Sequence, residues 1–400
     1  MRERRNGGKN IYTLSCVELY GVLELKGCLI CGKDLTDRIL TLDNMPKKAQ
    51  HMPAEKDLAT ERGMRLDLFQ CAKCGLVQFD CGPVEYYRDV IRAGGVSEKM
   101  RKLRKEQYEH FIQLFGLEGK KIWEVGCGGG EFLNILGDLP VQTFGVEHDP
   151  KLADTARKKG LTVEEGFVDS AYRSVNGPFD AFLSFNFLEH QPHPNEMLRG
   201  IFENLTDDGV GIITVPSFEY FLETASYYEF IRDHLAYYTS ETLSYLLIQN
   251  GFSVFEETRF NDDTLCVFVK KRKRIDSDTL IGNRQEINDA LLKCIEGFEK
   301  DTVAVWGASH QAFTILSTLG LGDKVSFIID SAPFKTGFYS PASHVRIVPP
   351  DTLKTSNTEC VIIMAPGYSD EICRQIISMR PNIRRIVSVI GRTVRILRDE

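Results

Sequence analysis

A glycine-rich turn between two short apolar segments constrains the fold of this chain more than any other feature. Residues 121–125 have the composition of a buried strand, and the turn Gly-Cys-Gly-Gly-Gly follows at residues 126–130. Residues 131–136 have helical periodicity, Gly137 can end that helix, and a second strand is expected at residues 141–146. The pattern predicts a βαβ unit whose turn lets a ligand approach backbone N–H groups at a helix N-terminus.

The spacing of acidic residues and glycines indicates which ligand this turn accepts. A dinucleotide fingerprint, G-x-G-x-x-G from Gly126, requires glycine at position 131, and the chain has glutamate there. The order acidic-x-Gly-x-Gly-x-Gly resembles instead the first motif of class I S-adenosylmethionine (SAM) methyltransferases, with Glu124, Gly126, Gly128 and Gly130. The resemblance implies that Glu147, 21 positions after Gly126, holds both ribose hydroxyls of SAM. An ordinary glycine-rich βα turn is the alternative interpretation.

Length and composition limit the classes of protein that are possible. A chain of 400 residues that is 42% hydrophobic and 26% charged is expected to be globular, with two or three domains. The net charge of −7 argues against a nucleic-acid partner. The basic run at residues 270–274 is interpreted as a solvated linker end, because a strand precedes it and an acidic stretch follows it.

Cysteine usage and the N-terminal sequence indicate a compartment. The first residues are charged and lack the apolar core of a signal peptide, and no segment approaches the roughly 18 apolar residues of a membrane span. Of the 11 cysteines, four form two Cys-x-x-Cys pairs and the others are scattered in apolar surroundings. This usage predicts a cytoplasmic protein with a metal site and no membrane contact, not a disulfide framework.

The two cysteine pairs predict an N-terminal zinc-binding module in residues 1–85. One pair is Cys28 and Cys31, and the other, after a gap of 39 residues, is Cys71 and Cys74. Two such knuckles supply four thiolates, the tetrahedral set that a structural Zn²⁺ ion prefers. The long gap predicts a small β insert between the knuckles. Four unrelated buried thiols are the alternative.

A helical segment precedes the glycine-rich turn. Residues 86–115 alternate charged and apolar positions at helical spacing, and paired glycines interrupt the start of this segment. We interpret residues 89–97 as a lid over the cofactor, with a plain connector as an equally weighted alternative.

Further alternation of strands and helices predicts an open, doubly wound α/β sheet in residues 86–274. Asp169 ends a strand-and-turn segment where adenine is expected to lie. The strand at residues 179–185 ends at the carboxyl edge of the sheet, where such sheets bind ligands. Antiparallel strands at residues 252–260 and 264–270 predict a closing hairpin, which class I SAM methyltransferases have and ordinary dehydrogenases lack.

Residues 275–400 predict a second, smaller Rossmann-like domain. Strands are expected at residues 302–306, 325–330 and 361–366, with helices between them and a last strand around Ile386. The domain has no G-x-G-x-x-G sequence, so no second dinucleotide is assigned to it.

Several of these segments together resemble the sugar C-methyltransferase family over nearly the whole chain. The zinc module resembles the family's at residues 71–78 and, loosely, at residues 44–46. Asn186-Phe-Leu-Glu-His190 resembles the family's fourth-strand motif. Residues 233–239, Asp-His-Leu-Ala-Tyr-Tyr-Thr, resemble its Glu-His-x-x-Tyr-Phe-Ser/Thr segment.

The resemblance implies a reaction and the residues that carry it. Members of this family methylate a carbon next to a ketone on a nucleotide-linked deoxysugar. A base removes the proton, an enolate forms, and its carbon attacks the SAM methyl group, which requires in-line placement of the reactants. His234, oriented by Asp233, is the predicted base. Asn186 or His190 is predicted to polarise the enolate oxygen. A structural role in capping or packing is the alternative for both histidines.

The residues expected to contact the methyl acceptor depart from the family pattern. Ile231-Arg232 stands where the family has Tyr-His, and Val90-Ile-Arg92 replaces a tyrosine-rich lid. Arg92 and Arg232 are therefore hypothesised to bind a phosphate or carboxylate of the acceptor, together with Tyr237.

The C-terminal domain resembles the family's in two motifs. Gly307-Ala is followed by a threonine seven positions after the glycine, and residues 330–341 have the order Asp-x-x-Pro-x-Lys-x-Gly-x-Tyr-x-Pro. His310, Lys335 and Tyr339 are predicted to bind phosphates of the nucleotide-linked sugar near a helix N-terminus. A scaffold or dimerisation domain is the alternative, and monomer and homodimer are both open.

Other functions compete with sugar C-methylation. O- or N-methylation of a nucleotide sugar or another small molecule needs only positioning and a weak base. A non-enzymatic zinc-module binding protein is a further class, and the acidic charge with the intact Glu124, glycine and Glu147 set argues against it. Methylation of RNA or protein is disfavoured because no aromatic and basic cluster lies near the knuckles.

Overall fold

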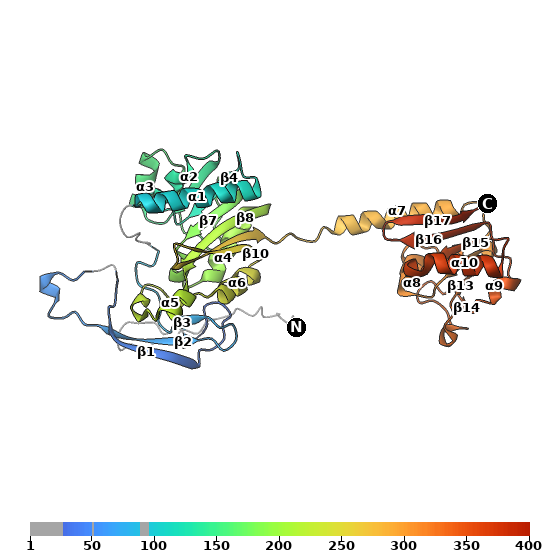
Figure 1. The fold of residues 1–400 in the computed structure, drawn as a ribbon, viewed down its shortest axis with the longest axis horizontal. Coiled ribbons are helices and arrows are strands. Elements are labelled where there is room, and N and C mark those ends of the chain that lie inside the picture. The colour runs from blue at the N-terminus through green and yellow to red at the C-terminus, as the bar shows by residue number, and fades with distance from the viewer. Residues whose placement is uncertain (1–26, 50–51, 89–95) are drawn as a thin grey trace, which may run out of the picture. The chain divides into compact units, whose positions relative to one another are not determined.

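The computed structural model describes residues 27–49, 52–88 and 96–400 (Figure 1). The chain divides into two compact units, Met1–Lys273 and Arg274–Glu400. The predicted boundary between the second and third domains lies one residue later. Arg92 and most of the predicted lid lie outside the described residues.

The central sheet of the first unit has the strand order β10-β11-β8-β7-β4-β5-β6 in the described chain (Figure 1). Its parallel part is β8, β7, β4, β5 and β6, and the antiparallel hairpin β10–β11 closes one edge beside β8. The strands are β4 (Lys121–Val125), β5 (Gln142–Glu147), β6 (Val163–Glu165), β7 (Phe179–Phe185), β8 (Leu205–Pro216), β10 (Phe252–Phe260) and β11 (Thr264–Lys271). The predicted Rossmann-like class with a closing hairpin is confirmed.

The helices of this unit connect the strands by crossovers. They are α1 (Glu98–Phe115), α2 (Glu131–Leu136), α3 (Pro150–Lys158), α4 (Pro194–Glu203), α5 (Phe218–Thr224) and α6 (Ser240–Gln249). Helix α1 begins later than predicted. Its N-cap is Ser97, whose hydroxyl accepts the N–H of Met100, and residues 85–88 form a turn. Residues 86–88, inside the segment predicted to be helical, therefore lie outside the helix, because the capping serine sets where α1 starts.

A small antiparallel sheet has the order β1-β2-β3-β9 in the described residues. Strands β1 (Asp37–Met45) and β2 (Met64–Gln70) lie within the insert between the cysteine pairs, and β3 is Val77–Phe79. Strand β9 (Ala236–Tyr237) comes from the segment that carries His234 and pairs with β3. Helix α5 packs on this sheet, since Phe218 and Phe221 share a core with β2 and β3 (Figure 1). The N-terminal module is thus continuous with the central sheet's unit.

The cysteine knuckles also share a hydrophobic core with that unit. Cys28, Cys71 and Cys74 are buried in one cluster with Tyr238 and with residues of α6. The Asn195 side chain at the start of α4 donates to the carbonyls of Leu29 and Ile30 at 3.2 and 2.9 Å. Removing the knuckles would therefore expose apolar surface of the central unit and not only of the module.

The second unit is a six-stranded sheet of described residues in the order β14-β13-β12-β15-β16-β17. Its strands are β12 (Val303–Trp306), β13 (Phe327–Ile329), β14 (Ile347–Val348), β15 (Cys360–Ile363), β16 (Arg385–Ile390) and β17 (Thr393–Asp399). Its helices are α7 (Ser277–Ile295), α8 (His310–Thr318), α9 (Thr352–Thr355) and α10 (Ser369–Met379). The first five strands pair in parallel, and β17 pairs antiparallel with β16. Strand β17 was not predicted; Gly391, at φ 56°, makes the short turn before it.

Substitutions of two leucines on helix α7 can test whether the second unit unfolds independently of the first. Leu291 is fully buried in that unit's core, whereas Leu280 on the same helix is 69% exposed. Leu291→Ala is expected to destabilise the second unit by about 2–5 kcal/mol because it leaves a cavity. Leu280→Ala, the matched control, is expected to change stability by less than about 0.5 kcal/mol.

Scanning calorimetry of the full chain measures both effects. The transition of the second unit should move to lower temperature in the Leu291→Ala variant alone, and the transition of the first unit should stay in place. Equal shifts of both transitions would show that the units do not unfold independently.

Candidate functional site

The glycine turn between β4 and α2 has the conformation that its sequence requires. Gly126, Gly128 and Gly130 have φ values of 72°, 58° and 80°, in the left-handed region that favours glycine. A Cβ atom at Gly130 would overlap the side chain of Leu161. The three glycines therefore form the tight turn that the sequence predicted, at the carboxyl edge of the sheet.

Glu147 at the end of β5 holds this turn in place. Its Oε2 accepts the N–H of Gly128 at 2.8 Å, and its Oε1 accepts the N–H of Asp149 at 2.9 Å. The residue is 5% exposed. Each carboxylate oxygen keeps a further lone pair, so Glu147 can fix the turn and still accept hydroxyl groups of a ribose.

A narrow cleft opens beside Glu147. Its walls come from the carboxyl ends of β4 and β5 and from the segments after β6 and β7, and they include Gly126, Glu147, His148, Phe167 and Phe187. The guanidinium of Arg88 lies over the Phe167 ring at 4.7 Å and lines the same cleft. An aromatic ring and a cation at this position suit a flat heterocycle such as adenine.

Sequence reasoning missed the aromatic walls of this cleft. Phe167 lies inside the segment predicted to contact adenine, so the sequence could have indicated it as a wall of the cleft. No sequence pattern indicated that Arg88 would line the cleft. Asp169, the residue predicted there, instead closes a turn, because its Oδ1 accepts the N–H groups of Ala171 and Tyr172 at 2.9 and 3.0 Å.

Two further predicted residues lie at the ends of neighbouring strands. Glu124 is fully buried in β4. Asn186 follows β7 at φ 47°, and its Oδ1 accepts the hydroxyl of Thr214 at 2.9 Å. The next residue, Phe187, packs over Gly126. The structure thus brings Asn186 to the edge of the cofactor turn.

A pair of imidazoles lies next to this edge. His190 belongs to the short 3₁₀ helix η2 (Leu188–His190), and His234 precedes β9. Their ring centroids are 4.7 Å apart in an edge-to-face arrangement. The Nδ1–H of His190 donates to the carbonyl of Asp233 at 2.9 Å, and the N–H of Leu235 donates to the carbonyl of Glu189 at 2.8 Å. These hydrogen bonds fix one loop against the other.

Burial controls the protonation of this cluster. Desolvation lowers the pKa of His190 and lowers the pKa of His234 well below its usual value. Desolvation raises the pKa of Glu189 to about 8. Both imidazoles are therefore neutral near pH 7 and have a lone pair to offer a proton or a ligand.

Asp233 does not orient His234, in contrast to the prediction. Its Oδ1 accepts the hydroxyl of Tyr86 at 2.8 Å, and its Oδ2 accepts the N–H of Ala49 at 3.0 Å. Residues 232 and 233 form a turn, which the N–H of His234 closes by donating to the carbonyl of Ile231 at 3.1 Å, and the Asp233 carboxylate bonds distant segments instead of its sequence neighbour. Through its backbone carbonyl, Asp233 orients His190 instead.

Arg232 and Tyr237, predicted to contact the acceptor, are turned into the protein. Arg232 is 6% exposed, and its Nη2 donates to the carbonyl of Gly82. The Tyr237 hydroxyl pairs with the backbone N–H and carbonyl of Ile231 at 3.0 and 3.1 Å. Both side chains hold the loop that carries His234 through these hydrogen bonds to the backbone, and Arg232 Nη1 is buried with no hydrogen-bond partner among the described residues.

The four predicted cysteine ligands come together. Cys28 Sγ and Cys74 Sγ are 3.4 Å apart, and Cys31 Sγ and Cys71 Sγ are 3.5 Å apart. The four sulfur atoms all lie within 4.8 Å of one another. A tetrahedral zinc ion with bonds of about 2.3 Å would place its sulfur ligands about 3.8 Å apart. The donor set and its spacing therefore fit Zn²⁺.

The predicted phosphate-binding residues of the second unit do not converge. Lys335 Nζ donates to the carbonyl of Ala308 at 2.9 Å and to Asp330 Oδ2 at 3.0 Å. His310 is exposed at the first turn of α8, and Tyr339 is 60% exposed. The lysine is therefore engaged within the fold, and the other two side chains face solvent.

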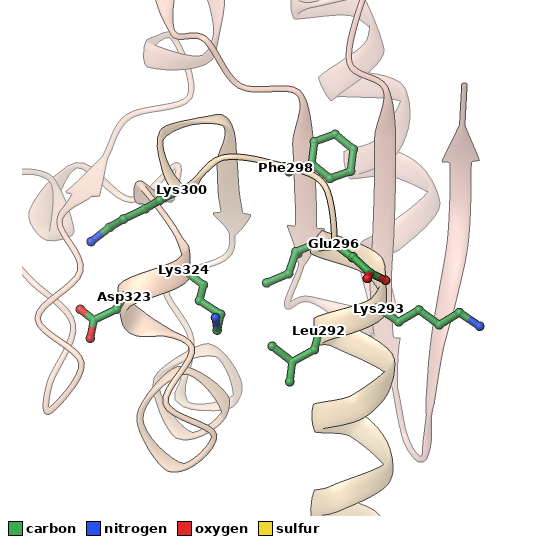
Figure 2. A pocket seen from close by; sticks show the side chains of 8 residues that line it. Leu292, Lys293, Glu296, Phe298, Lys300, Asp323 and Lys324 are labelled. Carbon is green, nitrogen blue, oxygen red and sulfur yellow. The ribbon is translucent and has the colours of Figure 1, made fainter.

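A larger cavity of about 530 Å³ lies elsewhere in the second unit (Figure 2). None of the predicted site residues lines this cavity. Its walls are formed by Leu292, Lys293, Ile295, Glu296, Phe298, Lys300, Asp323 and Lys324. Figure 2 shows the side chains of Lys293 and Lys300 pointing in opposite directions. These ammonium groups do not form a common anion site, and size alone does not make this cavity the centre of the chemistry.

Comparison with known families agrees with the cofactor site. Residues 100–257 match the family described as "Methyltransferase domain", and residues 278–390 match "C-methyltransferase C-terminal domain". Residues 100–257 therefore form a methyltransferase domain. The two matches, in this order, confirm the predicted resemblance to C-methyltransferases.

Curated relatives match this chain over a shorter stretch than the methyltransferase family does. The ubiquinone biosynthesis O-methyltransferase of Actinobacillus pleuropneumoniae serotype 7 is 31% identical over 105 residues, which are 24% of this chain and 45% of that protein. The enzyme of the same name from Xanthomonas oryzae pv. oryzae is 28% identical over 116 residues, 27% of this chain and 47% of that protein. The chain spans less than half the length of these relatives.

Solved structures resemble the first unit only in fold. A SAM-dependent methyltransferase from Clostridium acetobutylicum aligns with a TM-score of 0.36 at 14% identity, covering 43% of this chain and 92% of that one. The glycopeptide N-methyltransferase MtfA with SAM aligns with a TM-score of 0.35 at 13% identity, covering 42% of this chain and 94% of that one.

None of the helices in the described part of the chain is long and apolar enough to cross a membrane.

Glu147 gives a direct test of the cofactor site. Glu147→Gln removes one charged acceptor at the turn and is expected to weaken SAM binding about 10-fold or more. Glu165→Gln, an exposed residue at the end of the neighbouring β6, is the matched control and should bind SAM as the wild type does. Isothermal calorimetry with S-adenosylhomocysteine measures both. Equal affinities of the two variants would remove Glu147 from the cofactor site.

Proposed function

We propose that this methyltransferase transfers the SAM methyl group to a carbon next to a ketone on a nucleotide-linked deoxysugar. The observation that carries the proposal is the match of residues 278–390 to a C-methyltransferase C-terminal domain. A pair of neutral imidazoles beside the cofactor turn supports it, because forming a carbanion equivalent needs a proton acceptor close to the methyl donor.

In this proposal His234 takes the proton from the acceptor carbon, and the electron pair of the broken C–H bond moves onto the ketone oxygen as an enolate. Asn186 stabilises that negative charge through its side-chain NH₂ group, since its Oδ1 already accepts the Thr214 hydroxyl. His190, the other predicted residue, gives its one N–H to the Asp233 carbonyl, so it positions the loop and does not donate to the enolate. The enolate carbon then attacks the methyl group, and the C–S bond breaks to leave S-adenosylhomocysteine.

O-methylation of a related small molecule is the second candidate. The curated relatives are named as O-methyltransferases, which favours a hydroxyl acceptor in the same site. That acceptor would lose an O–H proton to His234 and attack through oxygen. A panel of uridine, guanosine and thymidine diphosphate ketosugars, analysed by mass spectrometry of the product fragments, separates carbon from oxygen methylation.

We also propose that Cys28, Cys31, Cys71 and Cys74 bind one structural Zn²⁺ ion. Four thiolates leave no open coordination position, so this ion would stabilise the module and take no part in the chemistry. Strand β3 follows the second knuckle and pairs with β9, so the same ion would help to hold the segment that carries His234.

Replacing His234 tests the proposed base. His234→Gln is expected to lower turnover about 10²–10⁴-fold, since general base catalysis contributes that much, while SAM binding stays unchanged. His193→Gln is the matched control, because His193 is exposed in the next loop. Normal turnover of the His234→Gln variant with every sugar in the panel would exclude this residue from the reaction.

Replacing a zinc ligand tests the proposed metal. Cys71→Ser is expected to lower the zinc content by one ion per chain and to destabilise the first unit, since structural zinc contributes on the order of 10 kcal/mol of binding energy. Cys81→Ser is the control, because Cys81 is also buried but lies outside the four-cysteine cluster. Elemental analysis and thermal unfolding report the two effects, and an unchanged zinc content of Cys71→Ser would reject the site.

A further inference from the structure

A second group of metal-ligand side chains lies where the acceptor is expected to bind. Glu189, His190 and His234 each have a ligand atom within 4.8 Å of the others. None of them belongs to the cysteine cluster. They come from two loops that the hydrogen bonds between residues 188–190 and 233–235 hold together.

The carboxylate of Glu189 is the most unusual member of this group. Its residue is 1% exposed, and neither carboxylate oxygen has a hydrogen-bond partner among the described residues. His190 Nε2 lies 4.0 Å from its Oε1, which is too long for a hydrogen bond. A buried carboxylate without partners is strongly disfavoured unless a cation or a proton compensates it.

The two imidazoles also present lone pairs. His190 uses its Nδ1 proton for the carbonyl of Asp233, so in the neutral ring Nε2 has a free lone pair. His234 Nδ1 is buried and has no hydrogen-bond partner in the described part of the chain. The three side chains therefore meet without a hydrogen bond between them in the described part of the chain.

The surrounding polar groups do not compensate the carboxylate. The Asp233 carboxylate is engaged by Tyr86 and Ala49, and the Tyr237 hydroxyl is engaged by Ile231. The Tyr238 hydroxyl is buried and forms no hydrogen bond with a described residue. No lysine or arginine pairs with Glu189 in the described structure.

We propose that Glu189, His190 and His234 bind one divalent transition-metal ion. Two imidazoles and one carboxylate are a ligand set that such ions accept, and three protein ligands leave coordination positions open. The hydrogen bond from His190 to a backbone carbonyl is the outer contact that metal-bound histidines usually make. A single ion would satisfy all three groups.

The role of this ion rests on the proposed methyl transfer. An acceptor oxygen bound at an open position would carry its negative charge next to the metal, whether it belongs to an enolate or to an alkoxide. An imidazole nitrogen that holds a metal cannot take a proton. The inference therefore keeps the proposed methyl transfer and its acceptor but replaces one part of the proposal, because His234 would act as a metal ligand and not as the base. Counting bound ions decides between these two roles of His234.

The test uses the full chain purified under reducing conditions and saturated with zinc at the cysteine site. Native mass spectrometry and titration with Co²⁺ count and characterise further ions. The wild type is expected to hold two ions, the second with the weak absorbance of nitrogen and oxygen ligands and not the intense thiolate bands. Glu189→Gln, His190→Gln and His234→Gln should each hold one ion and bind Co²⁺ at least 10-fold more weakly.

Two controls define the site. His193→Gln and Cys81→Ser should both keep two ions, because neither residue belongs to either ligand set. Binding of S-adenosylhomocysteine shows that each variant is folded. If a variant fails to fold, the ion count and spectrum of the wild type still decide the question.

One ion per wild-type chain, with the same Co²⁺ affinity in Glu189→Gln, would overturn the inference and indicate that a proton on Glu189 compensates its burial. That result would leave the proposed function intact, with His234 as the base. Failure of every ketosugar to accept a methyl group, with two ions bound, would reject the proposed acceptor and keep the metal site.

Discussion

Asp233 connects the parts of the structure on which the candidate site depends. Its carboxylate accepts the hydroxyl of Tyr86 and the backbone N–H of Ala49, and its carbonyl accepts the Nδ1–H of His190. One buried residue thus joins the N-terminal module, the segment before α1 and the loop after β7. Charge-assisted hydrogen bonds of this kind are stronger than neutral ones, so the joint is rigid where the chemistry needs fixed geometry.

The N-terminal module therefore belongs to the site as well as to the fold. Strand β9 completes its sheet, and its knuckles share a core with Tyr238 and α6. A small module cannot bury much apolar surface by itself, and this one gains stability from both the predicted zinc ion and the central unit. The same packing fixes the ends of the segment that carries His234, which explains how a structural module can influence chemistry that it does not touch.

Sequence patterns correctly predicted those elements whose structure depends on residues close together in the sequence. The glycine turn, α10 and the closing hairpin follow from periodicity and backbone preferences, and the cysteine knuckles from ligand spacing. Strand β9 was missed because two residues gain strand geometry only by pairing with β3. The partners of Asp233 and the burial of Glu189 depend on contacts between distant segments. No local pattern encodes such contacts, so the predicted pairing of Asp233 with His234 was wrong.

In the loop after β7, the fold buries the Glu189 carboxylate, although burial disfavours its ionised form. Parallel strands end together, so the sheet brings Asn186, Glu189 and His190 to the edge where the cofactor turn lies. Burial there removes the water that would solvate Glu189, and the free energy of the ionised carboxylate rises. A fold retains such a group where another charge compensates it. The proposed reaction would also create a negative charge on the acceptor at this edge, so any cation that stabilised Glu189 would stabilise the acceptor anion through the same field.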